Sequence, residues 1–248
     1  MKLADVTLCA AASVNVEATV AAIVRTLQQV ACARAVLFTD AEISLPDGIE
    51  RIAIGPLRSA ASYSRFVVRD LADWIDTSHC MIVQWDGFVL NPAAWDPRFL
   101  ECDYIGAPWP QFGDGHDVGN GGFSIRSRRL MLACRDPDFV DAGEAEDVAI
   151  ARTNRAMLEQ RHGITFADRS LASHFSHERT GQGQATFGFH GVFNLPGAVG
   201  IDGFWDIYRS LDHKGTIRVD FWPLLRKVAQ GPAGFRRAAR MIADRLAG

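Results

Sequence analysis

The sequence predicts an α/β fold with one mostly parallel central sheet and helices on both faces. Three continuous apolar runs, Val6–Ala11, Ala35–Phe38 and Cys80–Val83, are typical of strands that are buried on both faces. The stretches Val20–Leu27 and Ser62–Ile75 lie between these runs and carry apolar residues at helical spacing. Alternation of buried strands with helices predicts a parallel sheet.

The composition is that of a folded globular protein. The chain has 248 residues, of which 48% are hydrophobic, enough to offset the chain entropy that keeps disordered proteins unfolded. Lys and Arg total 26 against 29 Asp and Glu, which leaves a formal net charge of −3. A dedicated nucleic-acid binder would have an excess of basic residues, so we expect no nucleic-acid partner.

The cysteines and the hydropathy pattern indicate a cytoplasmic protein. The five cysteines are odd in number and show no C-x-x-C spacing, which favours free thiols in a reducing compartment. No run of about 18 uncharged apolar residues is present to span a bilayer. Asp5 interrupts the apolar stretch that an N-terminal signal peptide would need.

The chain contains no internal repeat and no clear linker, so we expect one domain over residues 1–200 and a C-terminal extension over 201–248. The extension ends in a predicted basic amphipathic helix. We expect its apolar stripe to pack on the domain, with contact to anionic lipid or to a partner protein as the alternative. The stripe and the accompanying arginines are Phe235, Ala238, Ile242 and Leu246, with Arg236, Arg237, Arg240 and Arg245.

Two acidic residues follow predicted strands. Asp40 ends the second apolar run and Asp86 comes shortly after the third. Ligands of parallel sheets bind beyond the carboxyl ends of the strands, where a carboxylate suits a divalent cation on diphosphate oxygens. Gly87 allows the backbone to approach a ligand closely. The alternative for Asp86 is that it only caps the next turn.

A glycine-rich segment, Gly119-Asn120-Gly121-Gly122, precedes another apparent strand. It lacks the spacing of a dinucleotide-binding loop and the lysine of a P-loop. We expect the backbone to pack closely against a flat polar ligand, with the Asn120 amide as a hydrogen-bonding group. An ordinary hairpin turn is the alternative.

Four further residues are candidates for binding or catalysis. Glu146 and Asp147 open a predicted helix, where acids are favoured by the helix dipole but where one of them could also act as a general base. His190 lies in a loop rich in glycine and phenylalanine, and a purely structural role is its alternative. Arg65 could bind a phosphate or form a surface ion pair.

Five segments in this order resemble a bacterial family of glycosyltransferase-like proteins known only as a domain of unknown function. The resemblance covers residues 3–194. The segments are QWDG at 84–87, DYIGAPW at 103–109, GNGGFS at 119–124, Glu146-Asp147, and FGFHG at 187–191.

Such proteins are similar to glycosyltransferases of the GT-A, Rossmann-like fold, which use a nucleotide-sugar donor. The resemblance implies that Asp86 and His190 bind Mn²⁺ or Mg²⁺ on the donor diphosphate, although Gln84 stands where many such enzymes have a first aspartate. It implies contacts of Asp40 with the nucleoside and of Arg65 with a donor phosphate.

The remaining matched positions would act on the sugar. Asn120, Gly121 and Gly122 resemble the segment that lines the sugar and acceptor site. Glu146 and Asp147 resemble the acidic pair that holds the base of inverting enzymes, and either residue is a candidate. The segment Pro110–Val118 would be a mobile lid that excludes water.

The sequence therefore predicts a metal-assisted glycosyltransferase of polysaccharide biosynthesis. It would move a sugar from a nucleoside diphosphate sugar to a glycan or glycolipid-linked acceptor. Inversion is expected if the base lies opposite the leaving group, and retention otherwise. The alternative function is a non-catalytic module on the same fold that binds a nucleotide or a carbohydrate.

Overall fold

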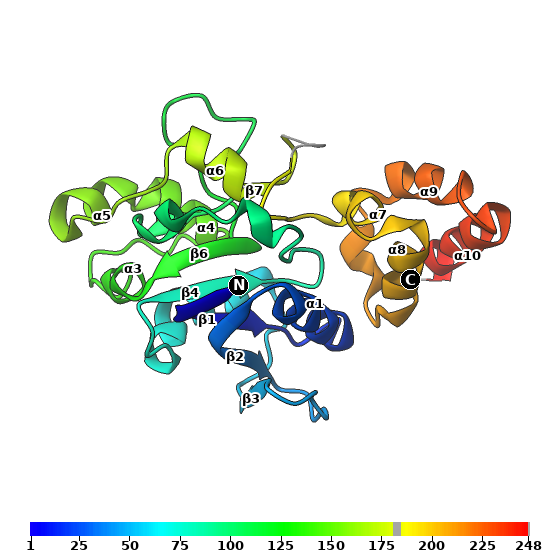
Figure 1. The fold of residues 1–248 in the computed structure, drawn as a ribbon, viewed down its shortest axis with the longest axis horizontal. Coiled ribbons are helices and arrows are strands. Elements are labelled where there is room, and N and C mark those ends of the chain that lie inside the picture. The colour runs from blue at the N-terminus through cyan, green and yellow to red at the C-terminus, as the bar shows by residue number, and fades with distance from the viewer. Residues whose placement is uncertain (181–184, 248) are drawn as a thin grey trace.

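The computed structural model describes residues 1–180 and 185–247, and its centre is a six-stranded sheet of order β3-β2-β1-β4-β6-β5 (Figure 1). The sequence GQGQ at 181–184 predicts a loop, and these residues lie outside the described part of the chain. Strands β1 to β4 are parallel, β6 is antiparallel to β4, and β5 is antiparallel to β6. The predicted α/β class is thereby confirmed. The strands are β1 (Lys2–Ala11), β2 (Ala31–Thr39), β3 (Glu50–Ala53), β4 (His79–Val83), β5 (Tyr104–Ile105) and β6 (Phe123–Ser127).

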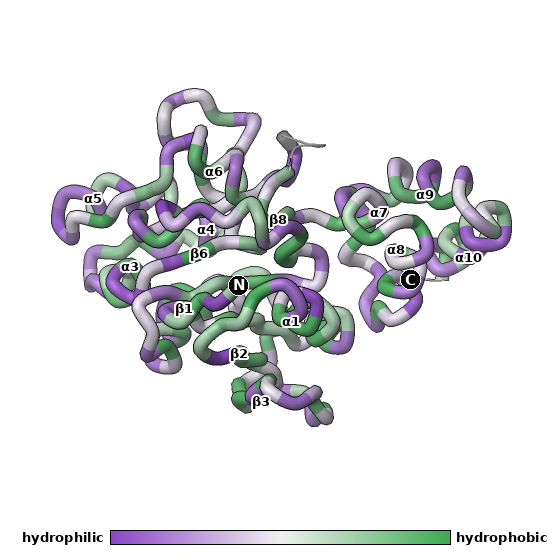
Figure 2. The backbone as a smooth tube through the Cα atoms, in the orientation of Figure 1, coloured by the Kyte–Doolittle hydropathy of each residue, from purple (hydrophilic) through white to green (hydrophobic). Residues whose placement is uncertain are grey.

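Helices cover both faces of this sheet because alternate residues of each buried strand point to opposite sides. Leu8 and Met81 belong to the core beneath α1 (Val16–Gln29), whereas their neighbours Cys9 and Ile82 belong to the core of the other face. Apolar segments gather in the strands, as the green stretches of Figure 2 show. The continuous apolar runs of the sequence therefore arise from burial on both faces.

The segment predicted as a helix over 62–75 is one helical stretch built from three parts. It begins earlier than expected, with α2 (Ala60–Arg65), and continues as a π-helical turn over Phe66–Asp70 and a 3₁₀ turn over Leu71–Trp74. Ser59 and Ser62 form a capping box at its start, which satisfies backbone N–H groups that have no partner in the helix.

The remaining α-helices and short strands of the first 190 residues surround the antiparallel part of the sheet. They are α3 (Arg128–Ala133), α4 (Glu146–Val148), α5 (Arg155–His162), α6 (Arg169–Phe175), β7 (Ser176–His177) and β8 (Gly188–Phe189).

Residues 195–247 form a group of helices beside the sheet, here named the C-terminal lobe (Figure 1). It packs on Ala18 and Ala22 of α1 and on Phe88 and Phe189, within one apolar cluster. No helix among the described residues is both long and apolar enough to cross a membrane. The helices of the lobe are α7 (Leu195–Ala198), α8 (Gly200–Ser210), α9 (Phe221–Ala229) and α10 (Gly234–Ala247).

We expected the apolar stripe of α10 to pack on the domain, but it faces outward instead. Phe235 is 87% exposed and Leu246 is 83% exposed, whereas Met241 is fully buried. The tight turn between α9 and α10 decides this orientation, because a Cβ atom on Gly234 would lie 2.1 Å from the carbonyl oxygen of Ala229. The face of α10 that carries Gly234 and Met241 must therefore turn inward.

Candidate functional site

A cavity of about 380 Å³ lies at the carboxyl ends of β1 and β4. The chain runs outward from β1 through β2 to β3 and then returns to β4 on the other side of β1. Such a reversal of strand order opens a crevice between the two central strands, where ligands of α/β sheets bind. The lining includes Ala11, Arg58, Tyr63, Gln84, Trp85 and His213.

Gln84 connects this cavity to the predicted acid and histidine. Its Nε2 donates to the Tyr63 hydroxyl at 3.0 Å. Its Oε1 lies 3.2 Å from Nε2 of His190, and because an amide oxygen only accepts, His190 must donate there. Gln84 is thus a bridging residue between the α2 side of the cavity and His190.

His190 lies between two carboxylates. Its Nε2 is 3.5 Å from Oδ1 of Asp86, and its Nδ1 is 3.7 Å from Oε1 of Glu178. Burial by itself would lower the pKa of His190, but the two carboxylates outweigh it and raise the pKa to about 10. The ring is therefore an imidazolium at neutral pH.

The glycine-rich segment brings the two halves of the site together. A Cβ atom on Gly122 would lie 2.1 Å from Nε2 of His190, and one on Gly121 would lie 1.9 Å from Oε1 of Glu146. Only glycine fits at these two positions. The segment does pack closely, but against the protein's own charged side chains. Asn120 has a left-handed backbone with φ of 51°, and its Oδ1 is buried without a hydrogen-bond partner.

The two acids of the pair have different surroundings. The Glu146 side chain is 7% exposed and its Oε1 lies 2.8 Å from Nη2 of the buried Arg126. Asp147 instead accepts hydrogen bonds from the N–H groups of Gly121 at 2.9 Å and Val148 at 2.8 Å. Burial, followed by the negative charge of Glu146, raises the pKa of Asp147 to about 6. Glu146 is held by an ion pair, whereas Asp147 can exchange a proton near neutral pH.

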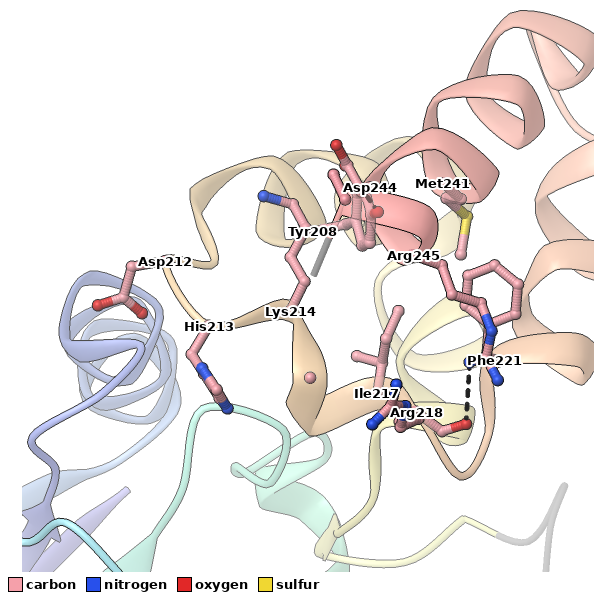
Figure 3. A pocket seen from close by; sticks show the side chains of 12 residues that line it. Tyr208, Asp212, His213, Lys214, Ile217, Arg218, Phe221, Met241, Asp244 and Arg245 are labelled. Atoms are coloured by element: carbon pink, nitrogen blue, oxygen red, sulfur yellow. Dashed lines mark hydrogen bonds between the residues drawn. The ribbon is translucent and has the colours of Figure 1, made fainter.

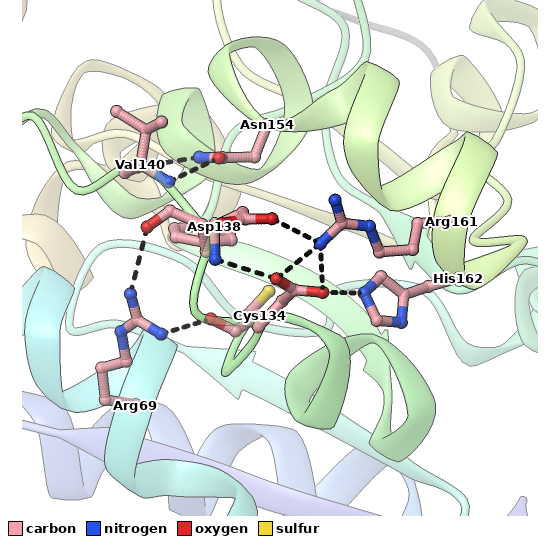
Figure 4. A network of polar contacts seen from close by, with 9 residues as sticks. Arg69, Cys134, Asp138, Val140, Asn154, Arg161 and His162 are labelled. Carbon is pink, nitrogen blue, oxygen red and sulfur yellow. Dashed lines mark hydrogen bonds and ion pairs between the residues drawn. The ribbon is translucent and has the colours of Figure 1, made fainter.

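A network of polar contacts anchors the helical segment that begins with the acidic pair (Figure 4). Asn154, just before α5, exchanges two hydrogen bonds with the backbone of Val140, at 2.7 and 2.9 Å. At the end of α5, Arg161 lies 3.0 Å and His162 2.8 Å from the Asp136 carboxylate. Contacts at both ends of α5 limit how far the acidic pair can move.

The segment 110–118, predicted as a lid, is fixed by the same helical region in this structure. Arg152 lies 2.7 Å from the Asp114 carboxylate and donates to the backbone oxygen of His116 at 2.6 Å. Its guanidinium also stacks on the ring of Phe112, 3.7 Å from the centroid. These contacts hold the segment to the residues that follow Asp147.

The structure gathers most, but not all, of the predicted site residues. Gln84, Asp86, His190, the acidic pair and the glycines meet in one place, with Asn120 beside them. Asp40 and Arg65 are exposed and do not line the cavity.

Four residues that the sequence analysis missed take part in the site. Arg58 and Tyr63 line the cavity close to the predicted Arg65, and His213 lines it from the C-terminal lobe. Glu178 faces His190. His213 lies outside the recognised motifs, so no motif could have identified it. Glu178 lies nine residues before the FGFHG motif and carries no spacing signal.

The predicted metal ligands form a pair and not a larger cluster. Within residues 1–180 and 185–247, no three His, Cys, Asp or Glu side chains are grouped as metal ligands. Asp86 Oδ1 is buried without a hydrogen-bond partner and faces His190. A carboxylate oxygen and an imidazole thus fit an ion only if the ring releases its proton and a ligand supplies further oxygens.

Two solved structures are similar to the chain at low identity. The crystal structure of A197 from STIV is 13% identical over 65% of this chain and 79% of that one, with a TM-score of 0.38. The crystal structure of a glycosyltransferase involved in the glycosylation of the major capsid of PBCV-1 is 9% identical over 82% of this chain and 98% of that one, with a TM-score of 0.47. Neither similarity assigns an activity.

No curated protein matches the chain significantly in sequence. A family model does match it, over residues 48–190, which include Gln84, Asp86, the glycine-rich segment, the acidic pair and His190. The match spans more than half of the chain, and the protein therefore belongs to DUF5672, a family of proteins of unknown function.

Proposed function

We propose that this protein is a glycosyltransferase that moves a sugar from a nucleoside diphosphate sugar to a glycan or glycolipid-linked acceptor. One observation carries the proposal. Asp86, His190 and Asp147 meet around Gly121 and Gly122, next to a cavity at the point where the strand order reverses. The resemblance of the five sequence segments to glycosyltransferase-like proteins supports the same function.

The cavity would hold the nucleoside of the donor. Its volume of about 380 Å³ lies within the usual range of small-ligand sites. Tyr63 and Trp85 offer aromatic surface, and Arg58 offers a cation at the rim. A diphosphate that left the cavity past Gln84 would reach Asp86 and His190. Their side chains are 13% and 16% exposed, which leaves them accessible to a ligand.

Positive charge at His190 would stabilise the leaving diphosphate. The imidazolium is held by Asp86 and Glu178 before any ligand binds, and such preorganised charge is effective in a site that excludes water. A divalent ion held by Asp86, His190 and donor phosphates would supply this positive charge in place of the imidazolium, because the ring must release a proton before it can bind a metal.

Asp147 would act as the general base. Its carboxylate would accept the proton of the acceptor hydroxyl while that oxygen forms a bond to the anomeric carbon. The bond from this carbon to the diphosphate breaks, and the diphosphate leaves with the electron pair. A pKa of about 6 suits this role, because Asp147 is mostly ionised at neutral pH yet basic enough to take a proton. Attack opposite the leaving group would invert the anomeric configuration.

Gln84 favours one alternative, a non-catalytic module that binds nucleotides. The residue stands where many related enzymes have an acid, and both ends of its amide are used in hydrogen bonds to Tyr63 and His190. Such a module would bind nucleoside diphosphates without turning over any donor.

The test is a turnover screen of nucleoside diphosphate sugars with glycan and glycolipid acceptors, with and without Mn²⁺. We expect product with one donor, and loss of product in Asp86→Asn and Asp147→Asn. Asp47→Asn is the matched control, because Asp47 is exposed in a turn far from these residues in the sequence. Nucleotide binding without turnover would favour the module, and equal turnover in all three variants would contradict the assigned roles.

A further inference from the structure

The charge of the chain is divided unevenly between its two parts. Residues 214–248 contain eight Lys and Arg and two Asp, a formal charge of +6. The rest of the chain has 18 basic and 27 acidic residues, a formal charge of −9. An asymmetry of this size indicates that the basic part meets an anionic surface.

Exposed apolar side chains are concentrated in the same part. Among the described residues, ten large apolar side chains are exposed, and five of these lie between residues 219 and 246. Scattered single residues of this kind are normal on protein surfaces, whereas a cluster marks an interaction site. The five are Val219, Trp222, Phe235, Ile242 and Leu246.

These side chains lie along α10 and beside its C-terminal end. Phe235, Ile242 and Leu246 are separated by seven and four residues and so form a single stripe along α10, about 16 Å long. Arg245 Nη1 reaches the backbone oxygen of Arg218 at 3.4 Å, and its guanidinium lies 5.6 Å from the ring of Trp222. These contacts bring Val219 and Trp222 to the end of α10 that carries Leu246.

A cavity of about 520 Å³ lies between η7 (the turn Lys214–Ile217), α9 and α10 (Figure 3). Lys214, Arg218 and Arg245 contribute basic groups to its lining, and Asp212 and Asp244 contribute acidic ones. Asp244 is already paired with Arg240 at 2.8 Å and accepts from the Tyr208 hydroxyl at 2.8 Å. The cations therefore keep most of their charge for a ligand such as a lipid phosphate.

We propose that the C-terminal lobe docks on an anionic lipid bilayer. The apolar stripe of α10 would enter the interface between headgroups and acyl chains, with Trp222 beside it. Arg218, Arg226 and Arg236, which form no ion pair with any residue in the described part of the chain, would contact lipid phosphates. Charge complementarity favours lipid over a second copy of the same lobe, because the lobe has nine basic and five acidic residues, a formal charge of +4, and two such lobes repel each other.

This inference does not depend on the proposed transferase activity, since vesicle binding is measured without donor or acceptor. The experiment is co-sedimentation of the full chain with vesicles of phosphatidylcholine alone or with 30% phosphatidylglycerol. We expect binding only to the anionic vesicles, and weaker binding as salt is raised from 50 to 500 mM.

The double variant Phe235→Glu/Leu246→Glu should reduce the partition coefficient between vesicles and water at least about tenfold. Two apolar groups that would be buried in the bilayer are lost, and two negative charges are added. Leu132→Glu/Val140→Glu is the matched control on the sheet domain, where both residues are also exposed. Equal binding of the two variants, or no preference for anionic vesicles, would overturn the proposal. Sedimentation velocity provides the third outcome: a dimer that only the lobe variant disrupts, without vesicle binding, would identify a second copy as the partner.

Discussion

The candidate site and the C-terminal lobe use charged residues in opposite ways. In the site, Arg126 faces Glu146, and His190 faces two carboxylates, so the charges are paired inside the protein. In the lobe, Arg218, Arg226 and Arg236 are exposed beside apolar side chains and have no ion-pair partner in the described part of the chain, although other lobe arginines are paired. Paired internal charges fix geometry, whereas unpaired surface charges attract a partner. The contrast matches the two proposals above, in which the sheet domain performs the chemistry and the lobe binds the membrane.

The largest expected difference between the two regions comes from removing the proposed base. Asp147→Asn should lower turnover by about a hundredfold to ten-thousandfold, the usual contribution of a general base. Vesicle binding should be unchanged. The measurement is steady-state turnover alongside co-sedimentation, with Asp47→Asn as the control. A fall in vesicle binding as large as the fall in turnover would break the proposed division between the regions.

Breaking the buried ion pair should destabilise the sheet domain strongly. Arg126→Met leaves the Glu146 carboxylate buried without its partner, which typically costs about 3–5 kcal/mol of unfolding free energy. Urea denaturation followed by tryptophan fluorescence measures this change. Arg209→Met, which breaks an exposed pair with Asp206 in the lobe, is the control and should have a much smaller effect. Similar losses in the two variants would contradict the distinction between internal and surface charges.

Asn15 makes one of the polar links between the two regions. Asn15 precedes α1 with a left-handed backbone, and its buried amide bonds to the N–H and C=O of His213 at 2.9 and 3.3 Å and to Thr216 at 3.2 Å. Asn15→Gly keeps this backbone conformation accessible but removes three hydrogen bonds, so unfolding free energy should fall by about 2 kcal/mol. Limited proteolysis should then cleave first between residues 195 and 247. Unchanged stability would mean that these three hydrogen bonds do not help to hold the lobe in place.

The pH dependence of turnover should follow the ionisation of Asp147, which lies in the sheet domain. Because Asp147 must be ionised to accept a proton, and its pKa is about 6, turnover should rise with pH up to about 7 and then level. Below pH 6 the rate should fall about tenfold for each pH unit. Any residual turnover of Asp147→Asn should lack this acid limb. A profile that is flat between pH 5 and 7 would exclude Asp147 as the base.

The smallest expected effect is the change in unfolding free energy when an exposed apolar side chain of the lobe is replaced. Phe235→Ser should change unfolding free energy by less than about 0.5 kcal/mol, because the side chain is 87% exposed and loses few contacts. Thermal unfolding measures it, with Met241→Ser as the destabilising comparison from the buried face of the same helix. A large loss of stability in Phe235→Ser would mean that the stripe packs within the protein in solution.

The sequence predicted those features that depend on local pattern. Apolar runs located β1, β2 and β4, and the glycine-rich segment and the late histidine located the centre of the site. Strand β3 was missed because its four residues, Glu50–Ala53, are too few and too polar to stand out beside the turn at Pro46. The antiparallel direction of β6 was also missed, since direction is set by long-range pairing with β4.

The base and the full cavity could not be assigned from sequence for the same reason. Glu146 and Asp147 are adjacent and chemically alike, and only their surroundings in the fold distinguish them: Arg126 pairs with Glu146, whereas the N–H of Gly121 donates to Asp147. Tyr63 and His213 reach the cavity from segments 150 residues apart. Which face of α10 points outward depends on how closely Gly234 approaches the preceding helix. The spacing of apolar residues in the sequence does not predict this contact.

The contact between Gly122 and His190 has a consequence for natural variation in this family. With no room for even a methyl group between them, the two positions should change together during evolution. Relatives that carry alanine or serine at 122 should carry a smaller residue than histidine at 190, and relatives that keep the histidine should keep the glycine.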